Sequence, residues 1–264
     1  MRSATVPALA VLLAACGTND TFPCRDASQC VLGGAAGRCE AVGWCSFPDA
    51  SCSGGFRFGD YAPPEIAGTC VGPDGTVVLA LTAAADAWID SGKPGVAYGL
   101  SATLSADGDP AANILLRFDL GGVPAGARLL QATLQVTTTP DGALAQGSAD
   151  VYVLRQAWAE GFRDDRVGSP NWTMRDDTTT WAGPGASAGA RGDAPIATFA
   201  PSTASTRFAV PVPLATVASW VAMPALNDGL VLVLRDAGSA AAKIHAREAG
   251  DPNARPRLVV AYKP

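Results

Sequence analysis

The sequence has little of what enzymes need. His245 is its single histidine, so a serine-hydrolase triad has at most one candidate for its base. A phosphate-binding loop and a dinucleotide-binding fingerprint are also missing. Among the carboxylates, no pair stands out as the acid and nucleophile of a glycosidase. These absences argue against a catalytic protein.

Charge is scarce as well. Charged residues make up 16% of the chain, the net charge is −5, and no basic block is present. Such a chain is a poor partner for nucleic acid. After the first residues, no apolar run approaches the roughly 20 residues of a membrane helix. Glycine (29) and proline (20) are abundant instead, which favours short strands joined by tight turns.

The N-terminus indicates export. Residues 1–15, MRSATVPALAVLLAA, have one arginine, a short apolar core and small residues, as a secretory signal peptide does. They run into Leu13-Ala14-Ala15-Cys16, which resembles the bacterial lipobox. The resemblance implies that Cys16 carries acyl chains, the only attachment to a membrane that we expect. Because Gly17 and not aspartate follows, the resemblance then implies the outer membrane or cell surface, with the extracellular side favoured. The alternative is an ordinary signal peptide with an incidental cysteine.

Residues 16–72 contain six further cysteines. They are Cys24, Cys30, Cys39, Cys45, Cys52 and Cys70. An even number in an exported segment predicts three disulfides, for which fifteen connectivities are possible. A zinc site would need C-x2-C pairs and histidine, and this segment has neither. We interpret it as a lipidated N-terminus with a disulfide-rich spacer or small recognition module.

Residues 73–264 form one β domain centred on residues 113–136. Ile114 and Leu116 alternate with Leu115 and Arg117, which predicts a strand buried on one face. After a glycine- and proline-rich break, a second strand is expected to pair with the first. Its inward residues are Leu130, Ala132, Leu134 and Val136. A second sheet must then cover this pair, because two strands alone are not stable.

The whole domain is predicted to be an all-β, antiparallel jelly-roll β-sandwich with one short helix. Its first strands are expected at residues 77–81 and 87–90, and a long irregular region at residues 157–190. The helix covers residues 213–222, where Leu214, Val217 and Val221 have helical spacing and are expected to be buried together.

Several short motifs follow one another along this domain. They are Asp86-Ala87-Trp88-Ile89, Leu115-Leu116-Arg117-Phe118-Asp119-Leu120, Pro124-Ala125-Gly126-Ala127, Trp158-x-Glu160, Trp181-x-x-Pro184-Gly185-Ala186, Asn227-Asp228-Gly229-Leu230, Arg247-Glu248 and Arg255-Pro256-Arg257-Leu258. Together, across residues 83–262, they resemble the DNRLRE domain family, which is disaggregatase-related and overlaps the family 96 carbohydrate-binding modules. The resemblance implies a non-catalytic jelly-roll module of surface proteins, some of which bind acidic polysaccharide. Such modules often accompany a catalytic domain, and none is recognisable here.

A row of donors is the first candidate ligand surface. On a strand, Lys243, His245 and Arg247 project to one face and are able to hold the carboxylates of a uronic-acid polymer. The alternative is a solvated face on which Arg247 pairs with Glu248 or another acid. Glu160, two residues after Trp158, is expected to bond backbone or an arginine.

Tryptophans are the second candidate. Trp172 and Trp181 lie in the long irregular region, where they serve either as platforms for sugar rings or as anchors of that region. Trp88 and Trp220 are expected in the core. No cofactor is expected apart from a structural calcium ion, for which Asp86, Asp90, Asp107 and Asp109 are candidate ligands.

Three functions remain in competition. The favoured one is a non-catalytic, lipid-anchored surface protein that binds an extracellular, acidic or matrix polysaccharide. The second is a structural or adhesive envelope protein that contacts other proteins without sugar affinity. The third, and least favoured, is a polysaccharide hydrolase or lyase. The sequence leaves the oligomeric state open.

Overall fold

The structure is a computed structural model that describes residues 21–40, 42–52, 54–63, 66–72, 75–238 and 240–264. The predicted signal peptide (residues 1–15) and the predicted lipidation site, Cys16, lie outside these residues. Among the described residues, no helix combines the length and the apolar character needed to cross a bilayer.

In the part of the chain that the structure describes, strands dominate the fold and there is one α-helix, α1 (Leu214–Ala222). The strands are β1 (Val31–Leu32), β2 (Ala35–Ala36), β3 (Arg38–Cys39), β4 (Cys45–Pro48), β5 (Phe56–Phe58), β6 (Cys70–Val71), β7 (Val77–Asp90), β8 (Val96–Tyr98), β9 (Thr103–Gly108), β10 (Ala111–Phe118), β11 (Arg128–Thr137), β12 (Ser148–Val153), β13 (Asp164–Val167), β14 (Ala197–Phe199), β15 (Arg207–Pro211), β16 (Leu230–Arg235), β17 (Ala241–His245) and β18 (Arg257–Lys263). Within the described residues, short 3-10 helices cover Ala27–Gln29, Pro184–Ala186 and Pro224–Leu226.

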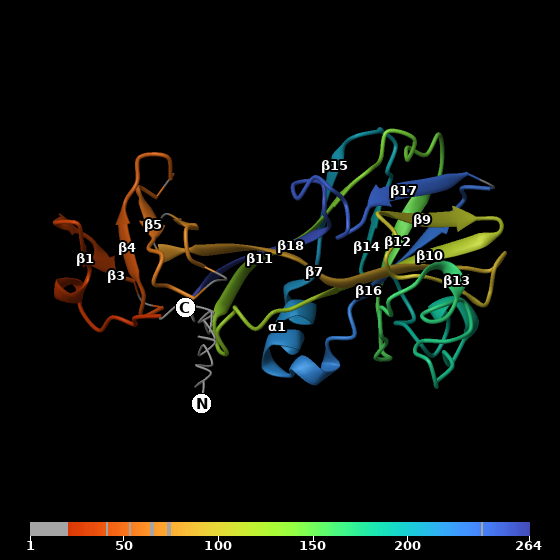
Figure 1. The fold of residues 1–264 in the computed structure, drawn as a ribbon, viewed down its shortest axis with the longest axis horizontal. Helices are drawn as coiled ribbons and strands as arrows, with labels where there is room; N and C mark the ends of the chain where they lie inside the picture. Colours follow the sequence, from red (N-terminus) through yellow and green to blue (C-terminus); the bar gives the residue numbers. More distant parts are fainter. Residues whose placement is uncertain (1–20, 41, 53, 64–65, 73–74, 239) are drawn as a thin grey trace, which may run out of the picture.

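Two antiparallel layers form the sandwich and share the long strand β7. In one layer the order is β15-β11-β18-β7, and in the other it is β14-β12-β16-β10-β7, with β9 and β17 continuing from β10. Residues 77–82 of β7 pair with β18, whereas residues 83–90 pair with β10. The all-β, antiparallel sandwich with one short helix is therefore confirmed, although the two strands predicted at residues 77–81 and 87–90 are one continuous strand (Figure 1).

The predicted pairing of the two central strands is wrong. β10 pairs with β7, β9 and β16, while β11 pairs with β15 and β18, so the two strands lie in different layers. Leu116 of β10 and Leu134 of β11 belong to the same core. The two strands thus face each other across this core, and the glycine- and proline-rich break between them connects the two layers.

β10 is buried on both faces rather than on one. Leu115, predicted to face outward, is 0% exposed. It packs in a second core with Leu154, Trp158 and Trp181, which all come from the region after β12. This long irregular region therefore covers the outer face of the β10 layer, which the alternation of residue types along β10 does not reveal.

Leu130 is also placed differently from the prediction. The pairing of β11 with β18 shifts in register between Leu129 and Gln131, and Leu130 is 38% exposed. A bulge adds one residue to one strand, so side chains on either side of it exchange faces. Ala132, Leu134 and Val136, beyond the bulge, are buried as expected.

The predicted helix is present, but the face that it buries differs from the predicted face. Val217 and Trp220 are buried, whereas Leu214 is 38% exposed and Val221 is half-buried. At 100° per residue, Leu214 lies about 90° from the middle of the face that Val217 and Trp220 define. The large indole of Trp220 thus sets the orientation of the helix, and the prediction that Leu214 is buried is wrong.

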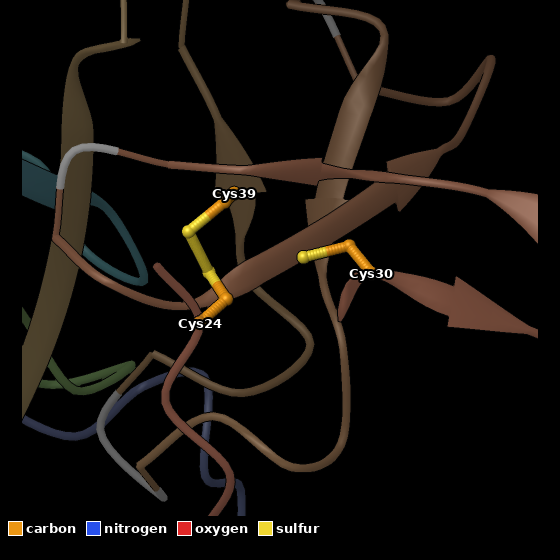
Figure 2. Close-up of side chains that lie close together, drawn as sticks. All are labelled: Cys24, Cys30 and Cys39. Carbon is orange, nitrogen blue, oxygen red and sulfur yellow. A yellow bond between two sulfur atoms is a disulfide. The ribbon is translucent and has the colours of Figure 1, made fainter. Parts of the chain in front are cut away.

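The six cysteines of the N-terminal segment form three disulfides, as predicted. The pairs are Cys24–Cys39, Cys30–Cys45 and Cys52–Cys70. Figure 2 shows Cys30 beside the Cys24–Cys39 bridge, and sulfur atoms of the three residues lie within 4.8 Å of one another. Because every one of these sulfurs is oxidised in a disulfide, the group offers no thiolate to a metal ion.

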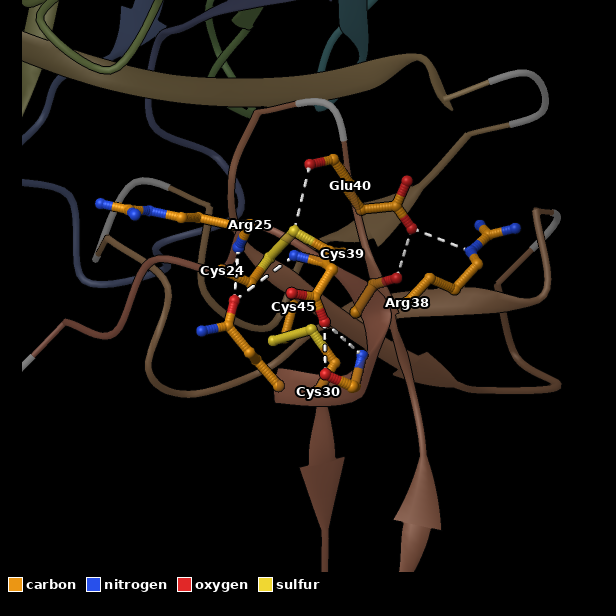
Figure 3. The surroundings of a disulfide bond; sticks show 11 residues. Cys24, Arg25, Cys30, Arg38, Cys39, Glu40 and Cys45 are labelled. Atoms are coloured by element: carbon orange, nitrogen blue, oxygen red, sulfur yellow. Dashed lines mark hydrogen bonds and ion pairs between the residues drawn. A yellow bond between two sulfur atoms is a disulfide. The ribbon is translucent and has the colours of Figure 1, made fainter.

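Polar contacts surround these bridges. Arg38 pairs with Glu40 at 2.9 Å next to Cys39 (Figure 3). A capping box between Asp26 and Gln29 stabilises the start of the 3-10 helix Ala27–Gln29. The segment is nevertheless continuous with the sandwich. β3, β4, β5 and β6 extend the first layer beyond β7, with Val71 paired to Val77.

Candidate functional site

The predicted row of donors is not free on one face. Lys243 Nζ lies 2.6 Å from Asp141 Oδ2, and His245 is half-buried at the end of β17. Arg247 lies beyond the strand, and its Nε is 2.8 Å from a carboxylate oxygen of Glu160 and 2.8 Å from one of Glu248. The structure therefore gives Lys243 and Arg247 acidic partners within the chain.

The two loop tryptophans pack against the protein. Trp181 is 4% exposed, and its Nε1 donates to the carbonyl of Asn171 at 3.0 Å. Trp172 is half-buried, and its ring lies so close to Gly185 that a Cβ there would overlap the indole. In these positions both side chains hold the irregular region in place, and Trp181 presents no ring face to solvent.

The four candidate calcium ligands separate into two kinds. Asp90 Oδ1 accepts from the backbone N–H of Gly92, and Asp107 Oδ1 accepts from that of Asp109, so these carboxylates cap their own turns. Asp86, in contrast, is 0% exposed within β7. In the described part of the chain, it is the one member of the four that lies in a group of three acidic side chains.

Asp86, Glu160 and Glu248, which we name the carboxylate cluster, come from three separate segments. Asp86 lies on β7, Glu160 follows Trp158 in the irregular region, and Glu248 follows β17. One carboxylate oxygen of each lies within 4.8 Å of one of each of the others. Backbone groups fix the arrangement. Glu160 Oε1 accepts from the N–H of Asp86, and Asp86 Oδ2 accepts from the N–H of Arg247, each at 2.7 Å.

Burial dominates the electrostatics of this cluster. It raises the pKa of Asp86 to about 8, against the opposing effect of the hydrogen bond from the Arg247 N–H. Burial also raises the pKa of Glu160, while its hydrogen bond from Asp86 and the charge of Arg247 act to lower it. Glu248 adds repulsion to both. In the absence of a further cation, the cluster resists full ionisation.

A second feature is an open groove beside α1, which we name the helix groove. Its volume is about 620 Å³. It is lined by residues 153–155, residues 192–194, Ile196, Thr216, Ser219 and Trp220 of α1, Leu226 and Asp228. Leu154 and Trp220 are buried beneath it, so the groove combines an apolar base with polar edges.

The polar groups of the helix groove carry both signs of charge. Arg155 and Asp193 form an exposed pair with 3.4 Å between Nη1 and Oδ2. Burial raises the pKa of Asp228, and the charges of Arg117 and Arg175 oppose that rise. The groove therefore offers guanidinium and hydroxyl donors together with carboxylate acceptors.

Neither the carboxylate cluster as a set nor the helix groove was predicted from the sequence. The groove residues come from three stretches far apart in the chain, and Asp228 alone among them belongs to one of the short motifs of the resemblance. For the carboxylate cluster a signal was present, because Asp86, Trp158-x-Glu160 and Arg247-Glu248 all belong to the motifs of the DNRLRE resemblance. That resemblance stays a prediction, since no family model matches the chain and no match was found among curated proteins.

Proposed function

We propose that this protein is a non-catalytic, lipid-anchored protein of the cell surface whose β-sandwich binds an extracellular polysaccharide in the helix groove. The mixed lining of that groove carries the proposal. Ligand sites typically combine an apolar surface with a few polar groups that fix orientation. Sugar hydroxyls both donate and accept, so they suit Arg155, Thr216 and Asp193 together.

The charge of the groove indicates which polysaccharide. One arginine beside two carboxylates leaves no excess of positive charge, which a polyuronate would need. A neutral chain fits this lining better than the acidic polymers that the family resemblance implies. Acidic polymers remain part of the test because the resemblance names them.

A non-catalytic role is proposed because the carboxylate whose pKa is raised most lies out of reach of a substrate. A general acid must come within hydrogen-bond distance of its substrate. Asp86, whose pKa burial raises most among the described carboxylates, is 0% exposed and has no contact with solvent. Polysaccharide binding without release of reducing ends is therefore the expected behaviour.

The test is affinity gel electrophoresis of the purified protein in gels that contain neutral or acidic polysaccharides. We expect retardation by at least one polymer. The double variant Arg155→Ala with Asp193→Ala should lose about 10-fold or more in affinity, because both removed groups are polar edges of the groove. Arg166→Ala, on the exposed strand β13, is the matched control and should migrate as the wild type does.

Two outcomes would contradict the helix groove as the site. One is loss of retardation in Lys243→Ala while the groove double variant, Arg155→Ala with Asp193→Ala, is retarded as the wild type is. That result would place the binding site at β17. The other is no retardation by any polymer. Reducing-end release from a polymer that binds would overturn the non-catalytic part of the proposal.

One observation favours protein adhesion as the second candidate. The N-terminal segment exposes Phe22 (60%), Val31 (60%) and Tyr61 (53%) around an apolar hollow of about 330 Å³. Grouped exposed apolar side chains are typical of surfaces that contact other proteins. If no polysaccharide binds but Val31→Asp abolishes attachment of the protein to cell envelopes, adhesion replaces sugar binding.

A further inference from the structure

Two buried oxygens of the carboxylate cluster have no hydrogen-bond partner. They are Oδ1 of Asp86 and Oε2 of Glu248. Asp86 is 0% exposed, so bulk solvent does not reach its free oxygen. Buried polar atoms in folded proteins are nearly always satisfied, and a buried carboxylate oxygen without a partner calls for a ligand.

The charges of the cluster point to the kind of ligand. Three ionised carboxylates carry a charge of −3. The guanidinium of Arg247, at 2.8 Å from Glu160 and Glu248, adds +1, so the net charge of the cluster with Arg247 is −2. One divalent cation neutralises this remainder. Because all the candidate donors are carboxylate oxygens, the cluster suits a hard cation.

We propose that the carboxylate cluster binds one calcium ion through Asp86, Glu160 and Glu248. Oxygens within 4.8 Å of one another can all reach a single ion whose ligand distances are about 2.3–2.6 Å. Calcium is favoured over magnesium because it tolerates irregular sets of ligands, whereas magnesium demands a near-ideal octahedron and retains water. The free oxygens of Asp86 and Glu248 become ligands, and Arg247 remains beside the site.

The ion would connect three parts of the domain. Asp86 holds β7, Glu160 holds the irregular region that covers the outer face of β10, and Glu248 holds the segment after β17. Its removal is expected to loosen the irregular region, because Glu160 joins that region to Asp86 on β7. This inference is independent of the proposed function and concerns the scaffold.

The direct test is a calcium titration of the full-length protein after treatment with EDTA. We expect one ion per chain and a melting temperature raised by about 5 °C or more when calcium exceeds its dissociation constant 100-fold. Terbium should bind at the same place and luminesce on excitation of tryptophan, because Trp158 lies two residues from Glu160. Absence of binding to calcium at millimolar concentration would overturn the proposal.

Variants distinguish this cluster from other acids. Glu248→Gln keeps the shape of a partly exposed side chain and should weaken calcium binding at least 10-fold, and Asp86→Asn should do the same. Asp107→Asn removes an acid that caps its own turn and should bind calcium as the wild type does. Wild-type affinity in both cluster variants, or its loss in Asp107→Asn alone, would refute the assignment.

Limited proteolysis gives a readout that does not depend on metal detection. Arg163 and Arg166 are exposed shortly after Glu160 and offer trypsin its cleavage sites in the irregular region. Calcium should slow cleavage there in the wild type and in Asp107→Asn. At a calcium concentration near the dissociation constant of the wild type, protection of Glu248→Gln should be much weaker, and equal protection of that variant would contradict the proposed site.

Discussion

At the scale of single residues, two leucines show how tertiary structure changes what a pattern means. Leu115 and Leu130 each lie in an alternating strand, and alternation places Leu115 outside and Leu130 inside. In the structure Leu115 is buried under the irregular region, whereas Leu130 is displaced to the surface by the bulge in β11. Alternating apolar and polar residues predict which side chains of a strand are buried only when the other face is exposed to solvent and the strand has no bulge.

This reversal gives a matched pair of variants. Leu115→Ala should lower the free energy of unfolding by about 2–5 kcal/mol, because it leaves a cavity in a closed core. Leu130→Ala, the same change at a partly exposed position, should cost less than about 1 kcal/mol. Urea denaturation followed by tryptophan fluorescence measures both. Equal costs for the two variants would contradict the placement of one of them.

At the scale of elements, the irregular region is fitted closely to the strands beneath it. Gly99, directly after β8, lies against the backbone of Glu160, and its N–H donates to the carbonyl of Arg163 at 3.0 Å. A Cβ at position 99 would overlap the carbonyl group of Glu160. Glycine is therefore required there for close approach of two backbones, not for an unusual backbone angle.

We accordingly expect Gly99→Ala to destabilise the domain by about 1–3 kcal/mol, since backbone cannot move aside as a flexible side chain does. Gly95→Ala is the control, because a Cβ at that position meets no atom within 4 Å. Thermal unfolding by circular dichroism compares the two variants. A melting temperature of Gly99→Ala equal to that of Gly95→Ala would show that the close approach is relaxed in solution.

At the scale of the whole molecule, the cysteine-rich segment and the sandwich are continuous. β6 pairs with β7, and Phe58, Ile66 and Val71 share a core with Leu79 and Tyr262. The predicted domain boundary after residue 72 thus falls between β6 and β7, which are paired strands of one layer. The disulfides stabilise a segment that is also held by the core of the larger domain.

Removal of the Cys52–Cys70 bridge tests this continuity. The variant Cys52→Ala with Cys70→Ala should lose about 3 kcal/mol, the usual effect for a loop of this length, with a sequence separation of 18. Because the core is shared, calorimetry should still record one transition at a lower temperature. Two separate transitions, one of them unchanged from the wild type, would show that the segment unfolds independently.

The sequence by itself determined the class of fold, the three disulfides and the single helix. Each of these follows from local information: side-chain alternation, an even number of cysteines close together, and helical spacing after Pro213. Only the tertiary structure decided which cysteines pair, which layer each central strand joins, and that the irregular region covers the β10 layer. It also decided that Asp86 lies close to Glu160 and Glu248, which follow it in the sequence by 74 and 162 positions. Contacts across such separations depend on how whole layers pack, and that packing is set by many residues at once rather than by any one stretch.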